Sequence, residues 1–264
     1  MDTYRYNASS KFTGTLNGNG HTISNLWINR PNDCDIGLFG FIKGGRIEKL
    51  GVKIADSGVI GQCNVGGIAG RITDLGKIIL SYSKRGVIQA KSGNTGGIVG
   101  YANGGFVLYS YSEGNVIGTT DVGGIVGRVN ADQISYSYST ASINGYDYVG
   151  GIAGFAKQSA VTNNAAINPL VDGSFDVNRV IGYDTNALTT LNNFALNTMM
   201  VSGTVIDDVG GLDGAGKKVD EFKLKATYLN GLDWYFGGRN IVIIGIGDKA
   251  WVIPANSYPK LYWE

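Results

Sequence analysis

Histidine is nearly absent from this chain, whose 264 residues include only His21. A catalytic histidine pair or a three-histidine metal site is therefore excluded, and any Ser-His-Asp or Cys-His arrangement would need that one residue. Because His21 follows the turn-like run Asn17-Gly18-Asn19-Gly20, we expect it in a turn or at the surface. Enzyme chemistry would have to rest mostly on carboxylates, Lys, Arg or Tyr.

Charge and long apolar runs are also scarce. Charged residues make up 16% of the chain, against roughly 25% in an average protein, and the net charge is +1. This balance favours neither nucleic acid nor an anionic membrane as a partner. No apolar run approaches the roughly 20 residues that span a bilayer. We therefore expect no nucleic-acid partner, no membrane-spanning segment and no cofactor.

Glycine is in excess, with 42 of 264 residues, or 16%, against about 7% on average. Collagen would need Gly at every third position and abundant Pro, whereas this chain has 4 Pro. Disorder is disfavoured, because 43% hydrophobic and 11% aromatic residues supply apolar surface that offsets the entropy of ordering. The composition thus predicts a folded chain rich in turns or close backbone contacts.

A short motif of Gly, two apolar or small residues and Gly recurs along the chain. Successive copies begin 30, 30, 27, 27, 28 and 32 residues apart. The copies are Gly37-Leu-Phe-Gly40, Gly67-Ile-Ala-Gly70, Gly97-Ile-Val-Gly100, Gly124-Ile-Val-Gly127, Gly151-Ile-Ala-Gly154 and the degenerate Arg179-Val-Ile-Gly182 and Gly211-Leu-Asp-Gly214. Self-similarity at such a period indicates a repeat architecture.

Other positions keep the same period. A Ser-Tyr-Ser unit follows three of the motifs, around Tyr82, Tyr111 and Tyr138, and an Asp or Asn precedes most copies. The preceding residues are Asp35 (with a one-residue gap), Asn64, Asn94, Asp121, Asp176 and Asp208, with Tyr148 as the exception. Within each repeat, apolar residues alternate over short runs bounded by Gly, Asn, Asp and Ser. This pattern is typical of strands and turns.

These features predict an all-β fold, a parallel β-helix solenoid of about seven coils that is right-handed by the usual preference. A propeller is the alternative, but it needs four strands and about 40 residues per blade. In a β-helix, equivalent side chains stack in columns about 4.8 Å apart. Tyr82, Tyr111 and Tyr138 should then form one column, facing inward if the alternation continues through the repeat. Of the two apolar residues in each motif, one should lie inside and one outside.

The repeats resemble the GLUG-repeat family, which takes its name from this Gly-apolar-apolar-Gly motif. The resemblance includes the segment from Phe12 to Leu26, the Ser-Tyr-Ser steps and a looser match of the tail around Trp251 and Tyr258-Pro259. Members are mostly parts of large secreted or surface-attached bacterial proteins, including adhesin-like chains and non-catalytic regions of some immunoglobulin-A peptidases. The resemblance implies an extracellular location and an architecture but no catalytic residues.

We expect two regions, a repeat β-helix over residues 1–214 and an aromatic-rich cap over residues 215–264 that packs on the last coil. A solenoid needs such a cap because its open end exposes apolar core and unpaired strand edges. Apolar residues at Val219, Phe222, Ala226 and Leu229 predict an amphipathic helix over 217–229. At the other end no such helix is evident, and we expect the chain to be a fragment of a longer protein.

Candidate binding residues are few, and each has a structural explanation that is favoured. The Asp and Asn series, with Asp121, Asp176 and Asp208, could bind calcium, but it lacks the dense Gly-Gly-x-Gly-x-Asp pattern of calcium-binding repeats. Turn formation and stacking explain it better. Trp234 and Trp251 could form a sugar-binding platform, although sealing the end of the rod explains them better. No metal site is expected.

The two cysteines, Cys34 and Cys63, lie about one repeat apart. If the first copy is aligned with a gap, they stack in adjacent coils, close enough for a disulfide. Without the gap they are offset and free. The sequence leaves both arrangements open.

No cluster of catalytic groups stands out. Some parallel β-helices are polysaccharide lyases or glycosidases, which need carboxylates clustered on one face. Here the best candidates, Asp132, Asp147 and Asp172, fall in different coils at different phases. We therefore expect a non-catalytic, secreted or cell-surface stalk or adhesin-like module that binds a glycan or a protein. The alternative is a carbohydrate-active β-helix, either a polysaccharide lyase or a glycoside hydrolase.

Overall fold

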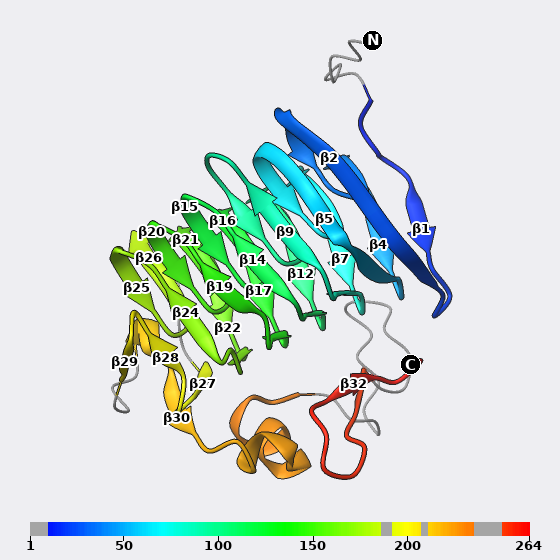
Figure 1. Ribbon diagram of the computed structural model, residues 1–264. Helices are drawn as coiled ribbons and strands as arrows, with labels where there is room; N and C mark the ends of the chain where they lie inside the picture. The colour runs from blue at the N-terminus through cyan, green and yellow to red at the C-terminus, as the bar shows by residue number, and fades with distance from the viewer. Residues whose placement is uncertain (1–9, 186–191, 207–210, 235–249) are drawn as a thin grey trace.

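The computed structural model describes residues 10–185, 192–206, 211–234 and 250–264. It shows an all-β solenoid of about six parallel coils with little helix (Figure 1). Strands that are one repeat apart in the sequence lie side by side, and nearly all of these pairings are parallel. The predicted fold class is confirmed.

Two six-stranded sheets form two sides of the stack. The first contains β1 (Thr15–Asn17), β4 (Arg46–Glu48), β7 (Lys77–Ile79), β12 (Phe106–Leu108), β17 (Gln133–Ser135) and β22 (Ala160–Thr162). The second contains β3 (Phe39–Lys43), β6 (Ala69–Thr73), β11 (Val99–Asn103), β16 (Val126–Asn130), β21 (Ala153–Lys157) and β26 (Ile181–Thr185).

The rest of each coil belongs to a third, larger sheet. Its strands are β2 (Thr22–Ile36), β5 (Gly51–Gly66), β8 (Tyr82–Lys84), β9 (Val87–Ala90), β10 (Thr95–Gly96), β13 (Tyr111–Ser112), β14 (Asn115–Ile117), β15 (Thr120–Gly123), β18 (Tyr138–Ser139), β19 (Ser142–Asn144), β20 (Asp147–Gly150), β23 (Ala165–Ala166), β24 (Leu170–Asp172), β25 (Phe175–Asn178), β27 (Phe194–Leu196), β28 (Met200–Val201), β29 (Thr204–Val205) and β30 (Ala215–Lys217). A separate hairpin pairs β31 (Trp251–Val252) with β32 (Lys260–Leu261).

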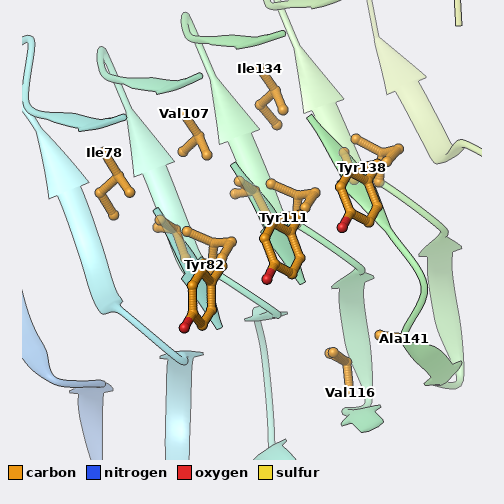
Figure 2. Packing of buried hydrophobic residues seen from close by; sticks show 14 of the residues in the cluster. Ile78, Tyr82, Val107, Tyr111, Val116, Ile134, Tyr138 and Ala141 are labelled. Atoms are coloured by element: carbon orange, nitrogen blue, oxygen red, sulfur yellow. The ribbon is translucent and has the colours of Figure 1, made fainter. Parts of the chain in front are cut away.

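The core consists of aliphatic columns that run along the stack. Ile78, Val107 and Ile134 are register neighbours on β7, β12 and β17, and each is at most 1% exposed (Figure 2). Each coil repeats the same inward positions, so apolar side chains meet their own kind in the next coil and stay away from water. The period in the sequence therefore becomes a vertical column in the structure.

The coil turns its corners at residues with positive φ. Asp35, Asn64, Asp121 and Asp176 adopt φ between 46° and 58°, a region that Asn and Asp tolerate better than most side chains. Tyr148 takes the same conformation, with φ of 53°, at the equivalent position. The Asp and Asn residues before the motifs are therefore corner residues, which agrees with the structural explanation of that series.

The motif differs from expectation in one respect. Both residues between the glycines are buried in the inner copies: Ile98 and Val99 are fully buried, as are Ile125 and Val126. The expectation that one of the two lies outside is wrong. The glycines explain the difference, because their lack of a side chain lets backbone from neighbouring segments approach; a Cβ on Gly127 would lie 2.6 Å from Asp121 O and from Thr95 N.

The seventh motif copy does not continue the second sheet, because Gly211–Asp213 forms a 3₁₀ turn at the end of the stack. After it, β30 still pairs in parallel with β27. Arg179, at the position of the first glycine in the sixth copy, is fully buried here and donates from Nη2 to Gly214 O at 3.0 Å.

The amphipathic helix predicted over 217–229 is not formed. Lys217 ends β30, a 3₁₀ turn covers Glu221–Lys223, Leu224 is extended, and a short π-helix covers Thr227–Gly231. Phe222 and Tyr228 are fully buried, whereas Val219 and Leu229 are exposed. Pairing with the last coil and burial of these two rings have overridden the local apolar spacing.

Within the described ranges, none of the helices has the length and apolar character that crossing a membrane requires.

Candidate functional site

The Asp and Asn corner column is held by hydrogen bonds within the protein. Asn64 Nδ2 donates to Asp35 Oδ1 and Asn94 Nδ2 donates to Asn64 Oδ1, both at 2.6 Å. Amides and carboxylates in this column thus bond to the copy in the next coil. No group of three or more His, Cys, Asp or Glu side chains among the described residues is arranged to hold a metal ion.

The three acidic residues singled out from the sequence have different surroundings. Asp121 is 4% exposed and its Oδ2 accepts from Arg128 Nη1 at 3.0 Å. Asp176 is an exposed corner residue. Asp208 lies outside the described residues. Asp121 therefore forms an ion pair within the protein. Burial raises the pKa of its carboxyl group, and Arg128 partly offsets that rise.

A second column, on the outer side of the second sheet, was not singled out from the sequence. It consists of the residue that follows the closing glycine of each motif copy, and we call it the outer column. Its members are register neighbours on β3, β6, β11, β16, β21 and β26: Phe41, Arg71, Tyr101, Arg128, Phe155 and Tyr183. The position after each of the first five is inward, as the burial of Ile42, Ile72, Ala102, Val129 and Ala156 shows.

The outer column alternates aromatic rings with guanidinium groups over its first five positions. The Arg71 guanidinium carbon lies 5.4 Å from the centre of the Phe41 ring and 5.8 Å from that of Tyr101. The corresponding distance from Arg128 to Phe155 is 4.0 Å. Distances within about 6 Å are those of cation–π pairs. The column is therefore a line of flat groups in which Arg71 packs against the rings on both sides and Arg128 packs against Phe155.

Corner carboxylates hold the two arginines in place. Arg71 Nε lies 3.1 Å from Asp35 Oδ1, and Arg128 Nη1 lies 3.0 Å from Asp121 Oδ2. The arginine side chains keep 34% and 36% of their surface exposed, while the aspartate side chains keep 9% and 6%. Each guanidinium is thus neutralised by an aspartate on its corner side, and about a third of each arginine side chain stays open to solvent.

The signal for this column was present in the sequence. Every copy of the motif except the last has Phe, Arg or Tyr immediately after its second glycine. Such large side chains at one fixed phase predict a line on one face of a solenoid. This position was not compared between the motif copies, and the outer column was therefore not predicted.

The tyrosine column forms as predicted. Tyr82, Tyr111 and Tyr138 are register neighbours, and their ring centres are 5.0 and 4.8 Å apart with nearly parallel planes (Figure 2). All three are at most 3% exposed. The prediction that equivalent side chains stack in a column from coil to coil is confirmed.

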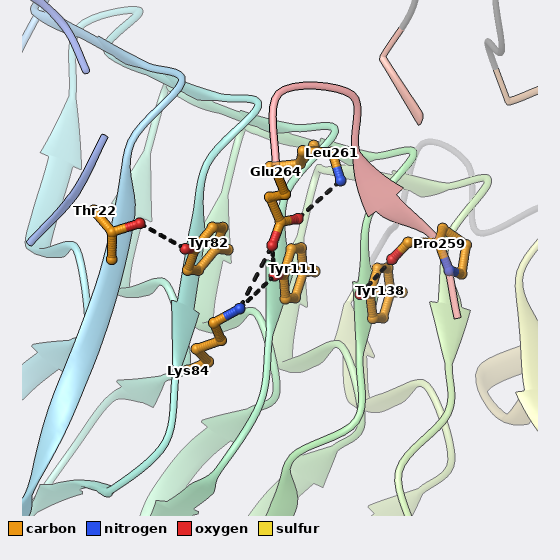
Figure 3. A network of polar contacts seen from close by, with 8 residues as sticks. All are labelled: Thr22, Tyr82, Lys84, Tyr111, Tyr138, Pro259, Leu261 and Glu264. Carbon is orange, nitrogen blue, oxygen red and sulfur yellow. Dashed lines mark hydrogen bonds and ion pairs between the residues drawn. The ribbon is translucent and has the colours of Figure 1, made fainter. Parts of the chain in front are cut away.

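The tyrosines do not point into the solenoid, however. The C-terminal segment covers them. Trp263 stacks on Tyr82 at 5.5 Å. Tyr138 Oη donates to Pro259 O at 2.7 Å (Figure 3). The inward expectation is wrong because a residue with positive φ, such as Tyr109, stands between the two strands. Alternation of faces holds only along a continuous strand.

A polar network joins this segment to the tyrosine column. Tyr111 Oη donates to Glu264 Oε2 at 2.6 Å, and Lys84 Nζ lies 3.3 Å from Tyr111 Oη and 3.5 Å from the same carboxylate oxygen (Figure 3). The other Glu264 oxygen accepts from Leu261 N at 2.9 Å. Burial, with Tyr138 and Glu264 nearby, raises the pKa of Tyr111 well above its usual range, so this phenol stays protonated and acts as the donor.

The two tryptophans proposed as a sugar platform are not at the surface. Trp234 is 1% exposed and Trp251 is fully buried; their rings stack on each other at 4.8 Å and contact Tyr138. Trp234 Nε1 donates to Asn163 O at 2.7 Å. The C-terminal residues 251–264 thus lie along the side of the stack and reach Tyr82, whereas we expected them on the last coil.

The carboxylates considered for catalysis are separate. Asp132 is buried at a corner, where its Oδ1 accepts from Gly105 N. Asp172 accepts from Asn144 Nδ2 at 3.3 Å, and Asp147 lies at the start of β20. Burial raises the pKa of Asp132 to about 7. Asp132 lies between β16 and β17, Asp147 on β20 and Asp172 on β24, so the three carboxylates belong to different segments of the solenoid.

His21 is exposed beside the Gly18–Gly20 turn, as expected, and its N donates to Gly18 O at 2.8 Å. Cys34 and Cys63 form a disulfide between β2 and β5, where they are register partners with Cα atoms 4.5 Å apart. The gapped alignment of the first repeat is therefore the correct one.

Comparison with known proteins supports the β-helix architecture and does not assign the chain to a family. No protein-family model matches the chain. A crystal structure of a putative immunoglobulin A1 protease from Bacteroides ovatus superimposes with a TM-score of 0.65 and 20% identity, covering 94% of this chain and 77% of that one. At this identity the likeness shows the fold alone.

Halomucin from Haloquadratum walsbyi is 39% identical over 90 residues, which are 34% of this chain and 1% of halomucin. The structural match supports the β-helix fold. Membership of the GLUG-repeat family is not shown by either match.

Proposed function

We propose that this chain is a non-catalytic binding module of a secreted or cell-surface protein, and that the outer column faces its glycan or protein ligand. The outer column is the observation that carries the proposal. It places three partly exposed rings (Phe41, Tyr101 and Tyr183) and two partly exposed guanidinium groups in one line on a sheet, and the register of six strands holds that line. A surface fixed in this way loses little entropy when a ligand binds.

Three further observations support the extracellular part of the proposal. The Cys34–Cys63 disulfide suits an oxidising compartment. The repeats resemble GLUG repeats, which are mostly found in secreted or surface-attached bacterial proteins. The structural neighbour is described as a putative immunoglobulin A1 protease, and immunoglobulin A is an extracellular protein.

The test is an array of glycans and extracellular proteins, probed with the intact chain, followed by product analysis on every ligand retained. We expect binding without cleavage. Turnover, seen as new reducing ends, as unsaturated products from a polysaccharide or as fragments of a bound protein, would contradict the non-catalytic function. A lyase or glycosidase, the alternative from the sequence, would then be the better assignment. Absence of any retained ligand would contradict the binding function itself.

A further inference from the structure

The outer column has a chemistry more specific than a general binding face. Phe41 and Tyr101 are half-buried rings on either side of the Arg71 guanidinium, and Tyr183 is 37% exposed further along. Arg128 lies over Phe155, which is itself only 8% exposed. Solvent along this line therefore meets Phe41, Arg71, Tyr101 and Arg128 in turn, and then Tyr183 beyond the buried Phe155.

The charges in the line are already paired. Asp35 and Asp121 neutralise Arg71 and Arg128 from the corner side. A strongly anionic ligand would have to compete with these carboxylates and approach them closely. The exposed N–H groups of the arginines remain good donors to uncharged oxygen atoms.

We propose that the outer column binds an extended, neutral polysaccharide that runs along the solenoid axis; this inference rests on the proposed binding function. A pyranose has an apolar C–H face, which packs against the exposed parts of the rings, and a rim of hydroxyl groups, which accept hydrogen bonds from guanidinium N–H. Strands of a sheet are 4.7–4.9 Å apart, about the length of one pyranose unit, so successive sugars meet successive coils.

The width of the line separates a sugar chain from a protein ligand. A column of largely polar, outward residues flanks it at the next outward position: Lys43, Thr73, Asn103, Asn130, Lys157 and Thr185. In it, Asn130 Nδ2 donates to Asn103 Oδ1 at 3.0 Å. Stable protein interfaces have a broad apolar centre with a polar rim. From Arg71 to Arg128 a single line of flat groups beside polar side chains suits a chain one sugar wide. At the far end the line widens, because the Tyr148 ring packs against Phe155 and Tyr183.

The experiment measures binding of the intact chain to neutral hexasaccharides (cellohexaose and mannohexaose) by calorimetry, with a hyaluronan hexasaccharide as the anionic comparison. The first variant is Tyr101→Ala, for which we expect a loss of affinity of about tenfold. The second is Arg71→Lys, which keeps the charge beside Asp35 but loses the flat donor fork, and we expect a loss of about fivefold.

Two matched controls lie outside the column. Tyr146→Ala removes a tyrosine that is 56% exposed, and Arg30→Lys changes an arginine paired with Asp33 at 2.9 Å. Both should bind neutral hexasaccharides within about twofold of the unaltered chain, since surface substitutions away from a site have small effects. Thermal unfolding of all four variants verifies that each one folds.

Each outcome decides the inference. A selective loss in the two column variants supports it. Neutral binding that these variants leave intact would overturn the site, and hyaluronan bound in preference to both neutral sugars would overturn the ligand class. If the array retains only proteins, this inference fails while the proposed binding function stands. If the array retains nothing, the proposed function fails as well.

Discussion

At the scale of single residues, the motif glycines are needed mainly because a side chain would not fit, and less because of their backbone flexibility. A Cβ on Gly127 would approach Asp121 O, Thr95 N and Gly100 O, all backbone atoms that cannot move aside independently. The same holds for Gly100, where a Cβ would lie 2.7 Å from Asn64 Cα. The motif glycines therefore permit close backbone contact between adjacent segments of the solenoid.

Replacing Gly127 with Ala should lower the free energy of unfolding by about 3 kcal/mol or more, since the clash is with backbone. Thr119→Ala, at an exposed position, is the comparison and should change it by less than about 0.5 kcal/mol. Chemical denaturation followed by circular dichroism measures both. Equal stability of the two variants would show that the coils can separate locally at little cost.

Asp132 should make the stability of the protein depend on pH. Its pKa is raised from 3.8 to about 7 by burial, and Oδ2 has no hydrogen-bond partner among the described residues. Between these two pH values the folded state holds a proton that the unfolded state releases. This contribution to stability is therefore complete below about pH 4 and is lost as the pH rises through about 7.

Asp132→Asn tests this, because the amide cannot ionise and its oxygen can still accept from Gly105 N. The stability of the variant relative to the unaltered protein should rise by about 1–3 kcal/mol between pH 5 and pH 8. Denaturation midpoints at both pH values give the comparison. A difference that stays constant with pH would mean that Asp132 is ionised in the folded state at both.

At the scale of elements, β2 and β5 are the longest strands of the stack, and they pair with several shifts of register. The disulfide fixes one point of that irregular pairing at Cys34 and Cys63. The link therefore compensates for a ladder that is less regular than those between the inner coils.

Cys34→Ser together with Cys63→Ser should destabilise the protein by about 3–4 kcal/mol, the loop-closure value for two cysteines 29 residues apart. The expected signature is a lower unfolding midpoint that no longer responds to reducing agent. The unaltered protein under reducing conditions is the natural control and should approach the variant. If reduction leaves its midpoint unchanged, the bond contributes nothing to stability.

Two elements show where reasoning from local pattern fails. The apolar spacing over 217–229 favoured a helix, yet the strand β30 and two short helical segments form because β27 offers a free edge and the last coil offers apolar surface. In the same way, the face of Tyr82 could not be read through Leu80, whose φ of 52° breaks the alternation between the strands. Neither effect is visible without the neighbouring coil.

At the scale of the whole molecule, the described C-terminal residues form a lateral cover. Trp234, Trp251 and Trp263 contact the tyrosine column at Tyr138, at Tyr111 and Tyr138, and at Tyr82, respectively. The segment therefore ties coils that are distant in sequence into one unit. The division into a repeat region over 1–214 and a C-terminal region over 215–264 stays a prediction.

Trp251→Ala tests that division. Removing a fully buried indole should cost about 3–5 kcal/mol, and we expect that loss to fall on the C-terminal segment first. Limited proteolysis followed by mass spectrometry should then show early cleavage after residue 215 while the repeats stay intact. Trp27→Ala, at an indole 59% exposed, is the matched control and should leave the cleavage pattern unchanged. Simultaneous cleavage of the repeats and of the C-terminal region would contradict the division and show that the two unfold as one cooperative unit.

The sequence alone determined the period of the chain, and with it the parallel β-helix, the tyrosine column and the corner role of residues such as Asp35. Those features depend only on like residues recurring at a fixed interval, which a parallel stack converts into contact. Tertiary structure decided what lies against each column: the C-terminal cover over Tyr111, and the carboxylates beneath Arg71 and Arg128. Such contacts join residues at different positions within the repeat, or residues far apart in the sequence. Their partners therefore depend on the three-dimensional path of the chain, which the repeat period does not specify.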